Sequence, residues 1–227
     1  MKKIASIGLF LTLFALGVQA QEPVSPLKLS TQLDSASYAM GASISFDLKS
    51  RGLSTLNYTA LMQAMQDVFA GKNPQISMQD GQQAIMAYFT SLKKKQEEPL
   101  IAAAGNFLAE NKKKKSVIAL PSGLQYEVLT AAKGAKPKAT DSVTVHYKGT
   151  LANGKQFESS YERNQPATLS LTQVIQGWVE GLQLMSVGAK YRFYIPYQLG
   201  WGANGAGQDI PPYSVVIFEI ELLKIAQ

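Results

Sequence analysis

The sequence contains no cysteine and only one histidine, His146, among its 227 residues. Without cysteine the chain can form no disulfide, no thiolate nucleophile and no iron–sulfur cluster. A single histidine argues against a histidine-rich zinc site and against a Ser-His-Asp triad. We therefore expect any reaction catalysed by this chain to need little acid–base chemistry, no metal and no cofactor.

Charged residues are also scarce, at 17 % of the chain against 46 % hydrophobic residues, which favours a folded protein with a sizeable core over a disordered one. The length suggests one or two domains. The formal net charge is +6, and the basic residues cluster at 93–95 and 112–115 with no aromatic residues between them. Such runs are typical of solvated helix faces, so we expect no nucleic-acid partner.

Long apolar runs are missing after residue 20, but residues 1–20 read as a secretory signal peptide. Lys2 and Lys3 precede a mostly apolar stretch, and Val18-Gln19-Ala20 is a small-x-Ala cleavage site. The stretch is short for a membrane span, although an uncleaved N-terminal anchor is the alternative. We expect a mature protein in the periplasm without a membrane anchor, beginning with a flexible N-terminus at residues 21–32.

Residues 33–115 have a helical pattern of apolar residues. A first helix is expected to begin near Asp34 or Ser35. Asn57 is a good N-cap for a second helix, which the Gly and Pro of residues 71–74 should end. Ser77 begins a capping-box-like start for a third helix.

Pro99 interrupts this third pattern, because proline cannot donate to the carbonyl of Lys95 and its ring crowds that turn. The sequence predicts a kink or short break near residues 95–99, with the helix continuing to about Lys114. These short helices carry little core of their own, so their apolar stripes are expected to pack against a second copy of the chain.

The pattern changes at Pro121 to alternating strands with Gly and Pro between them. Leu124, Tyr126 and Val128 alternate with polar residues, and Asn153-Gly154 is a strong hairpin signal. A short helix is expected from Val174 to Met185. About five antiparallel strands with one helix predict an α+β domain in which the helix closes one face of the sheet.

Six sets of motifs occur here in the order typical of one family. They are Val145-His146-Tyr147-Lys148-Gly149-Thr150-Leu151 with Asn153-Gly154-Lys155-Gln156-Phe157-Glu158-Ser159-Ser160, Val174-Ile175-Gln176-Gly177-Trp178, Met185-Ser186-Val187-Gly188, Gly200-Trp201-Gly202, Ile210-Pro211-Pro212 and Phe218-Glu219-Ile220-Glu221-Leu222-Leu223. Each is weak alone, but together they resemble the FKBP-type peptidyl-prolyl cis/trans isomerases.

The resemblance extends to bacterial proteins of the macrophage-infectivity-potentiator type, through residues 37–41 and 121–126. It implies an α+β protein with an all-helical N-terminal dimerisation domain and long linking helix at residues 33–115. An antiparallel FKBP sheet wrapped on one short helix should follow at residues 121–227. A homodimer is implied, as is isomerisation of X–Pro bonds in unfolded or partly folded exported proteins. Binding of macrolides of the tacrolimus and rapamycin type is a further implication.

By resemblance, Trp178 should form the floor of the catalytic pocket, and the Ile175 backbone N–H should bind a substrate carbonyl. The residues implied in catalysis are Tyr147, Phe157, Glu158, Val174, Ile175, Trp178, Trp201, Ile210 and Phe218. Simple core packing is the alternative for the aromatic members, but at Trp178 a purely structural residue could be smaller.

Three residues depart from the family pattern. Glu158 replaces an aspartate, and its extra methylene could either preserve or misplace a hydrogen bond to Tyr147. Trp201 replaces a tyrosine, and an indole N–H can donate but not accept. Ala167 replaces an aromatic residue near Leu169, which should weaken macrolide binding more than catalysis. These changes motivate the alternative of a non-catalytic periplasmic chaperone that uses the same pocket and an inter-subunit cleft.

Two further features are given structural interpretations. His146 alternates with Tyr147 along the strand, so it should face away from the pocket. The glycines between residues 200 and 207 lack the strand–loop–helix context of a phosphate loop and are interpreted as a mobile flap.

Overall fold

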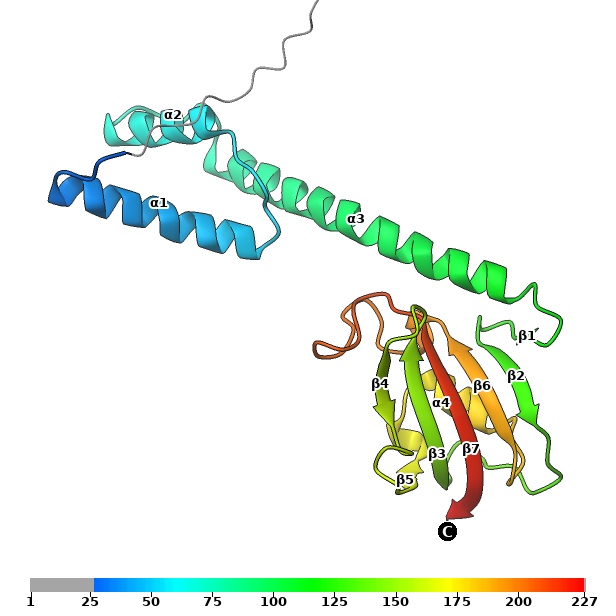
Figure 1. Cartoon of the computed structure of the whole chain (residues 1–227). Coiled ribbons are helices and arrows are strands. Elements are labelled where there is room, and N and C mark those ends of the chain that lie inside the picture. The colour runs from blue at the N-terminus through cyan, green and yellow to red at the C-terminus, as the bar shows by residue number, and fades with distance from the viewer. Residues whose placement is uncertain (1–26, 227) are drawn as a thin grey trace, which may run out of the picture. The chain divides into compact units, whose positions relative to one another are not determined.

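The computed structural model describes residues 27–226, so the signal peptide predicted at residues 1–20 lies outside the described part. The chain divides into two compact units, one ending at Ser54 and one starting at Thr55. The first contains helix α1 (Gln32–Ser50), and the second contains α2 (Tyr58–Phe69), α3 (Met78–Asn111) and the β-sheet (Figure 1). Within residues 27–226, no helix combines the length and apolar character needed to cross a membrane.

α1 begins at Gln32, slightly before the predicted start near Asp34 or Ser35, because a capping box fixes its first turn. The Asp34 backbone N–H donates to Thr31 Oγ1 at 3.0 Å, and the Thr31 N–H donates to Asp34 Oδ2 at 2.8 Å. These bonds satisfy two donors that the start of a helix otherwise leaves free.

The predicted starts of the next two helices are confirmed. Asn57 Oδ1 accepts from the Ala60 N–H at 3.0 Å at the start of α2, and Ser77 Oγ accepts from the Asp80 N–H at 3.0 Å at the start of α3. Gly71 follows α2 with φ +69°, a conformation that glycine adopts without a steric penalty.

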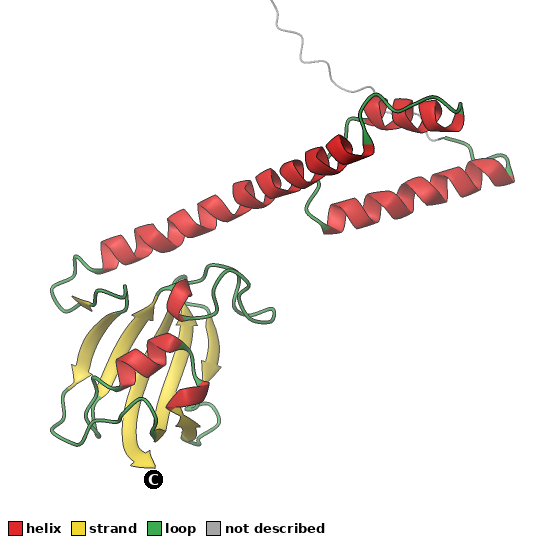
Figure 2. Ribbon diagram, turned by 180° about the vertical axis from the view of Figure 1, so that it is seen from behind, coloured by secondary structure: helices red, strands yellow, loops and turns green. Residues whose placement is uncertain are grey.

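The break predicted at Pro99 is wrong. α3 is helical without interruption for 34 residues, and Figure 2 shows one continuous helix. It ends at Asn111 rather than near Lys114. Proline removes only the bond to the Lys95 carbonyl, and both residues are exposed, so water can hydrate that carbonyl. The loss of one bond does not end a helix supported on both sides of it.

The sheet has seven antiparallel strands in the order β1-β2-β6-β7-β3-β4, with β5 paired to β3. It is larger than predicted because β1 and β4 are short segments. The strands are β1 (Ile118–Ala119), β2 (Gln125–Thr130), β3 (Ser142–Leu151), β4 (Gln156–Ser159), β5 (Ala167–Ser170), β6 (Lys190–Ile195) and β7 (Val216–Ala226).

The predicted short helix covers one face of this sheet as α4 (Gln176–Leu182) (Figure 2). It is shorter than predicted because Val174 and Ile175 are extended and because the helix ends at Leu182; a 3-10 turn, η1 (Leu171–Gln173), precedes Val174. Two glycines bring it close to β6. A Cβ on Gly177 would lie 2.5 Å from Ile195 Cγ2, and one on Gly181 would lie 2.6 Å from Phe193 Cε1. The core therefore forms between α4 and the sheet.

On β2 the predicted alternation is present, but polar residues are the buried ones. Gln125 and Glu127 are buried, whereas Val128 is 43 % exposed. Gln125 Nε2 donates to the Leu108 carbonyl at 2.9 Å, and Asn111 Nδ2 donates to Gln125 Oε1 at 3.0 Å. The end of α3 thus supplies hydrogen-bond partners for the buried Gln125 side chain.

Glu127 is the centre of a second polar cluster beside this contact. Its carboxylate accepts from the Tyr194 hydroxyl at 2.6 Å, from Arg192 Nη1 at 3.2 Å and from the Ser116 hydroxyl. Burial alone raises the pKa of Glu127, but the three donors outweigh burial and hold the pKa below the ordinary value of 4.5.

We expect the contribution of Glu127 to stability to depend on pH. Because its folded-state pKa is lowered, this contribution is complete above the ordinary glutamate pKa and is lost as pH falls through the folded value. Glu127→Gln should lower the free energy of unfolding by about 1–3 kcal/mol at pH 7 and by less at pH 3, measured by urea titration. Glu98→Gln, which removes an exposed carboxylate paired with Lys94 on α3, is the control and should change the free energy of unfolding by at most about 0.5 kcal/mol at either pH.

Candidate active site

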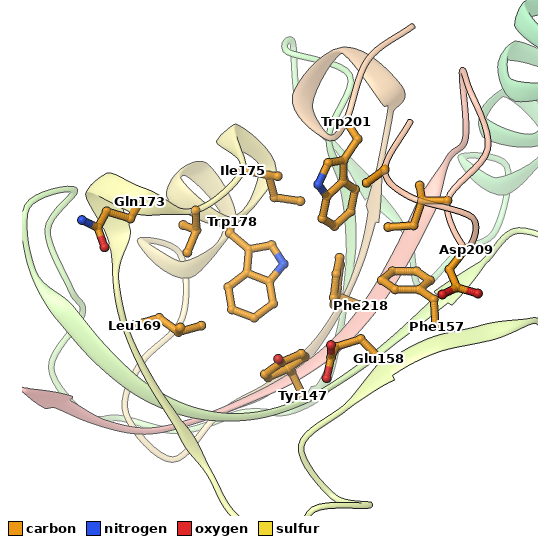
Figure 3. A pocket seen from close by; sticks show the side chains of 13 residues that line it. Tyr147, Phe157, Glu158, Leu169, Gln173, Ile175, Trp178, Trp201, Asp209 and Phe218 are labelled. Atoms are coloured by element: carbon orange, nitrogen blue, oxygen red, sulfur yellow. The ribbon is translucent and has the colours of Figure 1, made fainter. Parts of the chain in front are cut away.

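A cavity of about 430 Å³ opens beside the start of α4. Figure 3 shows the side chains of the 13 residues that line it. All nine residues named from the sequence are among them: Tyr147, Phe157, Glu158, Val174, Ile175, Trp178, Trp201, Ile210 and Phe218. The other four, which the sequence did not single out as site residues, are Leu169, Gln173, Ala206 and Asp209. Residues from β3, β4, α4, β7 and the loop after β6 thus meet at one place.

Aromatic rings at near-right angles form the inner surface. The Trp178 ring lies 5.2 Å from that of Tyr147 and 5.1 Å from that of Phe218, with interplanar angles of 82° and 90°. Phe157 meets Phe218 at 5.5 Å and Trp201 at 6.0 Å, also edge to face. Such packing fixes the rings and leaves a rigid apolar surface facing the cavity.

Gly149 on β3 makes this arrangement possible. A Cβ there would lie 2.7 Å from Phe157 Cζ and 2.7 Å from Phe218 Cε1. Both rings therefore pack directly over the strand backbone. The close packing of these two rings thus explains why the first motif has a glycine at residue 149, which the strand pattern alone could not indicate.

Trp178 is 4 % exposed, and among the described residues its indole Nε1 has no hydrogen-bond partner. In Figure 3 the nitrogen lies on the side of the ring nearer Phe218. The ring of Phe218 packs perpendicular to the indole, with 5.1 Å between the ring centroids. The floor of the pocket is therefore an aromatic ring packed against two other aromatic rings.

The backbone N–H of Ile175 is a free donor at the cavity. Ile175 is the N-cap of α4 with φ −61° and ψ 150°, and it has no side-chain capping bond. None of the described residues accepts a hydrogen bond from this N–H. Helix starts leave such donors available for an acceptor on a ligand.

Glu158 does not bond Tyr147 directly, and Arg163 bridges the two. Arg163 Nη1 donates to Glu158, and Arg163 Nη2 donates to the Tyr147 hydroxyl at 3.3 Å. The hydrogen bond to Glu158 is the main cause that raises the pKa of Arg163 above its already high value. Sequence reasoning missed Arg163, because its contact with Tyr147 depends on how β3 and the turn after β4 lie in the fold.

The loop between β6 and β7 forms the part of the cavity wall that contains Trp201, Ala206, Asp209 and Ile210. This loop includes a second 3-10 turn, η2 (Tyr197–Leu199). Ala206 and Ile210 pair through two backbone bonds of 2.8 and 3.1 Å. Gly205 has φ +66°, and a Cβ on it would lie 2.1 Å from the Ile210 carbonyl oxygen. The tip of this loop is a tight turn, and it places Ile210 and Asp209 at the cavity.

Two residues weighed from the sequence lie elsewhere. His146 does not line the cavity; its Nδ1 lies 3.0 Å from Ser160 Oγ and its ring stacks on Tyr161 at 4.7 Å. Ala167 does not line it either, whereas Leu169 on the same strand does. A leucine therefore occupies the wall near the missing aromatic residue.

Comparison with known families supports the same assignment. Residues 133–223 match the family described as FKBP-type peptidyl-prolyl cis-trans isomerase. Residues 33–128 match the domain described as amino terminal to FKBP-type peptidyl-prolyl isomerase. Together the two families cover the helical part and the sheet.

Individual relatives agree. The chain is 54 % identical over 119 residues to an FKBP-type peptidyl-prolyl cis-trans isomerase, FkpA, of Aeromonas hydrophila, a match that covers 52 % of this chain and only 44 % of that protein. It is 37 % identical over 204 residues to the outer membrane protein MIP of Legionella longbeachae, with 87 % of each chain covered. The crystal structure of FkpA from Escherichia coli is similar with a TM-score of 0.58 and 33 % identity, covering 87 % of this chain and 98 % of that one.

The two family matches therefore account for both the helices before the sheet and the domain that contains the sheet and the cavity. The chain belongs to the FKBP-type peptidyl-prolyl cis-trans isomerase family, in the two-domain form with a helical domain before the FKBP domain.

Proposed function

We propose that this protein accelerates rotation about X–Pro bonds, and that residues 121–227 form the catalytic domain. The observation that carries the proposal is an aromatic cavity with a free backbone donor at its edge. Rotation faces a barrier of about 18–20 kcal/mol because the planar amide is stabilised by resonance. No covalent bond breaks, so a desolvating pocket is sufficient chemistry.

The cavity favours the twisted amide over the planar one. The planar form separates charge between oxygen and nitrogen, and the twisted form loses this separation. An apolar surface made of Trp178, Phe157 and Phe218 withholds the water that stabilises the planar form. Only an interaction that is stronger in the transition state lowers the barrier, and this difference in solvation is one.

The free N–H of Ile175 is proposed to orient the substrate. A hydrogen bond to the oxygen of the rotating bond would stabilise its planar form and oppose rotation. We therefore assign the Ile175 donor to the carbonyl of the proline itself, with the ring over Trp178. Tyr147, held by Arg163, and Trp201 then border the ring on either side.

The test is a cis/trans assay on short Xaa-Pro peptides, read by isomer-specific proteolysis. The full chain without its signal peptide should relax the cis population well above the uncatalysed rate, which has a time constant of tens of seconds or longer. If aggregation of an unfolded client is suppressed while the isomerisation rate stays at background, the pocket binds without catalysis and the proposal fails.

The substrates are proposed to be unfolded or partly folded exported proteins. The predicted signal peptide and the outer-membrane name of the Legionella relative support a location beyond the cytoplasmic membrane. Within that compartment we propose the periplasm, with residues 33–115 pairing two copies of the chain. Recovery of a chain beginning at Gln21 from the periplasmic fraction would test the location.

A further inference from the structure

The polar groups around the cavity are unevenly distributed. The lining contains two carboxylates, Glu158 and Asp209, but no lysine or arginine. Figure 3 shows both carboxylates on the side of Phe157, with Gln173 and Leu169 on the opposite side of Trp178. The carboxylates that line the pocket therefore lie on one side of it only.

The backbone around Asp209 is held in place. Asp209 lies inside the tight turn closed by the Ala206–Ile210 pair, and Gly205 lies against the Ile210 carbonyl. The turn thus fixes the backbone position of Asp209 beside the cavity that this residue lines. That pre-organisation is what a recognition residue needs.

The two carboxylates differ in how firmly they are engaged. Glu158 is bound to Arg163, which also holds Tyr147, so displacing Arg163 would disturb the aromatic wall. Among residues 27–226, Asp209 accepts only from Lys155 Nζ, at 2.9 Å, and the side chains of Asp209 and Lys155 are 66 % and 52 % exposed. Exposed ion pairs of this kind are weak, so a substrate cation can replace Lys155 at little cost.

The direction of the substrate decides which of its residues meets Asp209. If the proline carbonyl binds the Ile175 N–H, the chain after proline leaves on the Ile175 side. We place the residue before proline on the side of Trp178 away from Gln173 and Leu169, where Figure 3 shows Phe157 and Asp209. This step rests on the proposed function and on its orientation of the substrate.

We propose that Asp209 is a specificity-determining residue that favours substrates with a basic residue immediately before the proline and disfavours acidic ones. Lys155 acts as the resident competitor for the same carboxylate. Attraction of a cation and repulsion of an anion by one carboxylate give discrimination without changing the apolar surface that binds the proline.

The test compares the peptides Ala-Lys-Pro-Phe, Ala-Leu-Pro-Phe and Ala-Glu-Pro-Phe in the isomerisation assay. The measured quantity is the ratio of kcat/KM for the lysine peptide to kcat/KM for the glutamate peptide, with the leucine peptide as the uncharged reference. In Asp209→Asn this ratio should fall by about two- to five-fold, the range expected for one exposed pair. In Lys155→Met it should rise, because the carboxylate loses its competitor.

Two controls separate recognition from general charge effects. Asp209→Glu should restore most of the ratio, and Glu110→Gln, which breaks an exposed ion pair between Glu110 on α3 and Lys113 after it, should leave the ratio unchanged. An active wild type whose ratio is the same in Asp209→Asn would overturn this inference while leaving the proposed function intact. A wild type that accelerates none of the three peptides would instead overturn the proposed function and this inference with it.

Discussion

Replacing Trp178 with leucine is expected to lower kcat/KM for an uncharged Xaa-Pro peptide by about ten- to a hundred-fold. Trp178 forms the floor of the cavity, and its ring contacts those of Tyr147 and Phe218 at 5.2 and 5.1 Å. Losing an aromatic contact with the proline ring removes about 1.5–3 kcal/mol of apolar stabilisation. Each 1.4 kcal/mol lost in the transition state slows the reaction about ten-fold.

The same substitution also affects the core, because Trp178 is 4 % exposed. Leu182→Ala is the matched control, since Leu182 lies on the same helix, is fully buried and does not line the cavity. It should destabilise the domain by about 2–5 kcal/mol while kcat/KM, measured well below its melting temperature, stays close to wild type. Equal losses of activity in the two variants would mean that Trp178 acts only through packing.

Local signals in the sequence predicted much of this structure. Asn57, Ser77 and Gly71 occupy capping positions, where a side chain or a positive φ acts within a few residues and can be recognised without knowing the fold. The site residues came from the resemblance to the FKBP-type family, which implies which segments meet at the pocket. The nine residues that it selected all line one cavity.

The features that sequence reasoning missed depend on contacts between distant segments. Arg163 becomes important only because β3 brings Tyr147 beside the turn after β4. Asp209 reaches the cavity only through the tight turn at Ala206 and Ile210. Neither contact can be recognised from a short-range pattern of residues in the sequence.

Burial on β2 shows the same limit. The alternation of Gln125 and Glu127 with apolar neighbours favours polar residues in water, which would hold for a sheet with one open face. Here the end of α3 and the segment after it cover that face and supply matching donors from Asn111 and Ser116. A buried glutamine on a strand is therefore a sign of a covering element, and that element could be identified only from the structure.

The second large effect is expected in the oligomeric state of the protein, which should depend on the apolar faces of the helices before the sheet. No side chain of α1 is buried, and the only buried side chain of α2 belongs to Asp67. On α2, Tyr58, Met62, Met65 and Phe69 share one face at helical spacing, and Phe69 is 91 % exposed. An isolated helix as short as α2, with 12 residues, is marginal in water, so its apolar face needs a partner.

We therefore expect the mature protein to have twice the mass of one chain in light scattering at micromolar concentration. Met62→Asp combined with Phe69→Asp should give the mass of one chain, because burying two carboxylates in an apolar interface costs far more than the contacts they replace. Ala60→Asp, on the opposite face of α2, adds the same kind of charge and should stay dimeric. A wild type with the mass of a single chain would overturn pairing through these helices. A double variant that keeps twice that mass would show that α2 is not the contact surface.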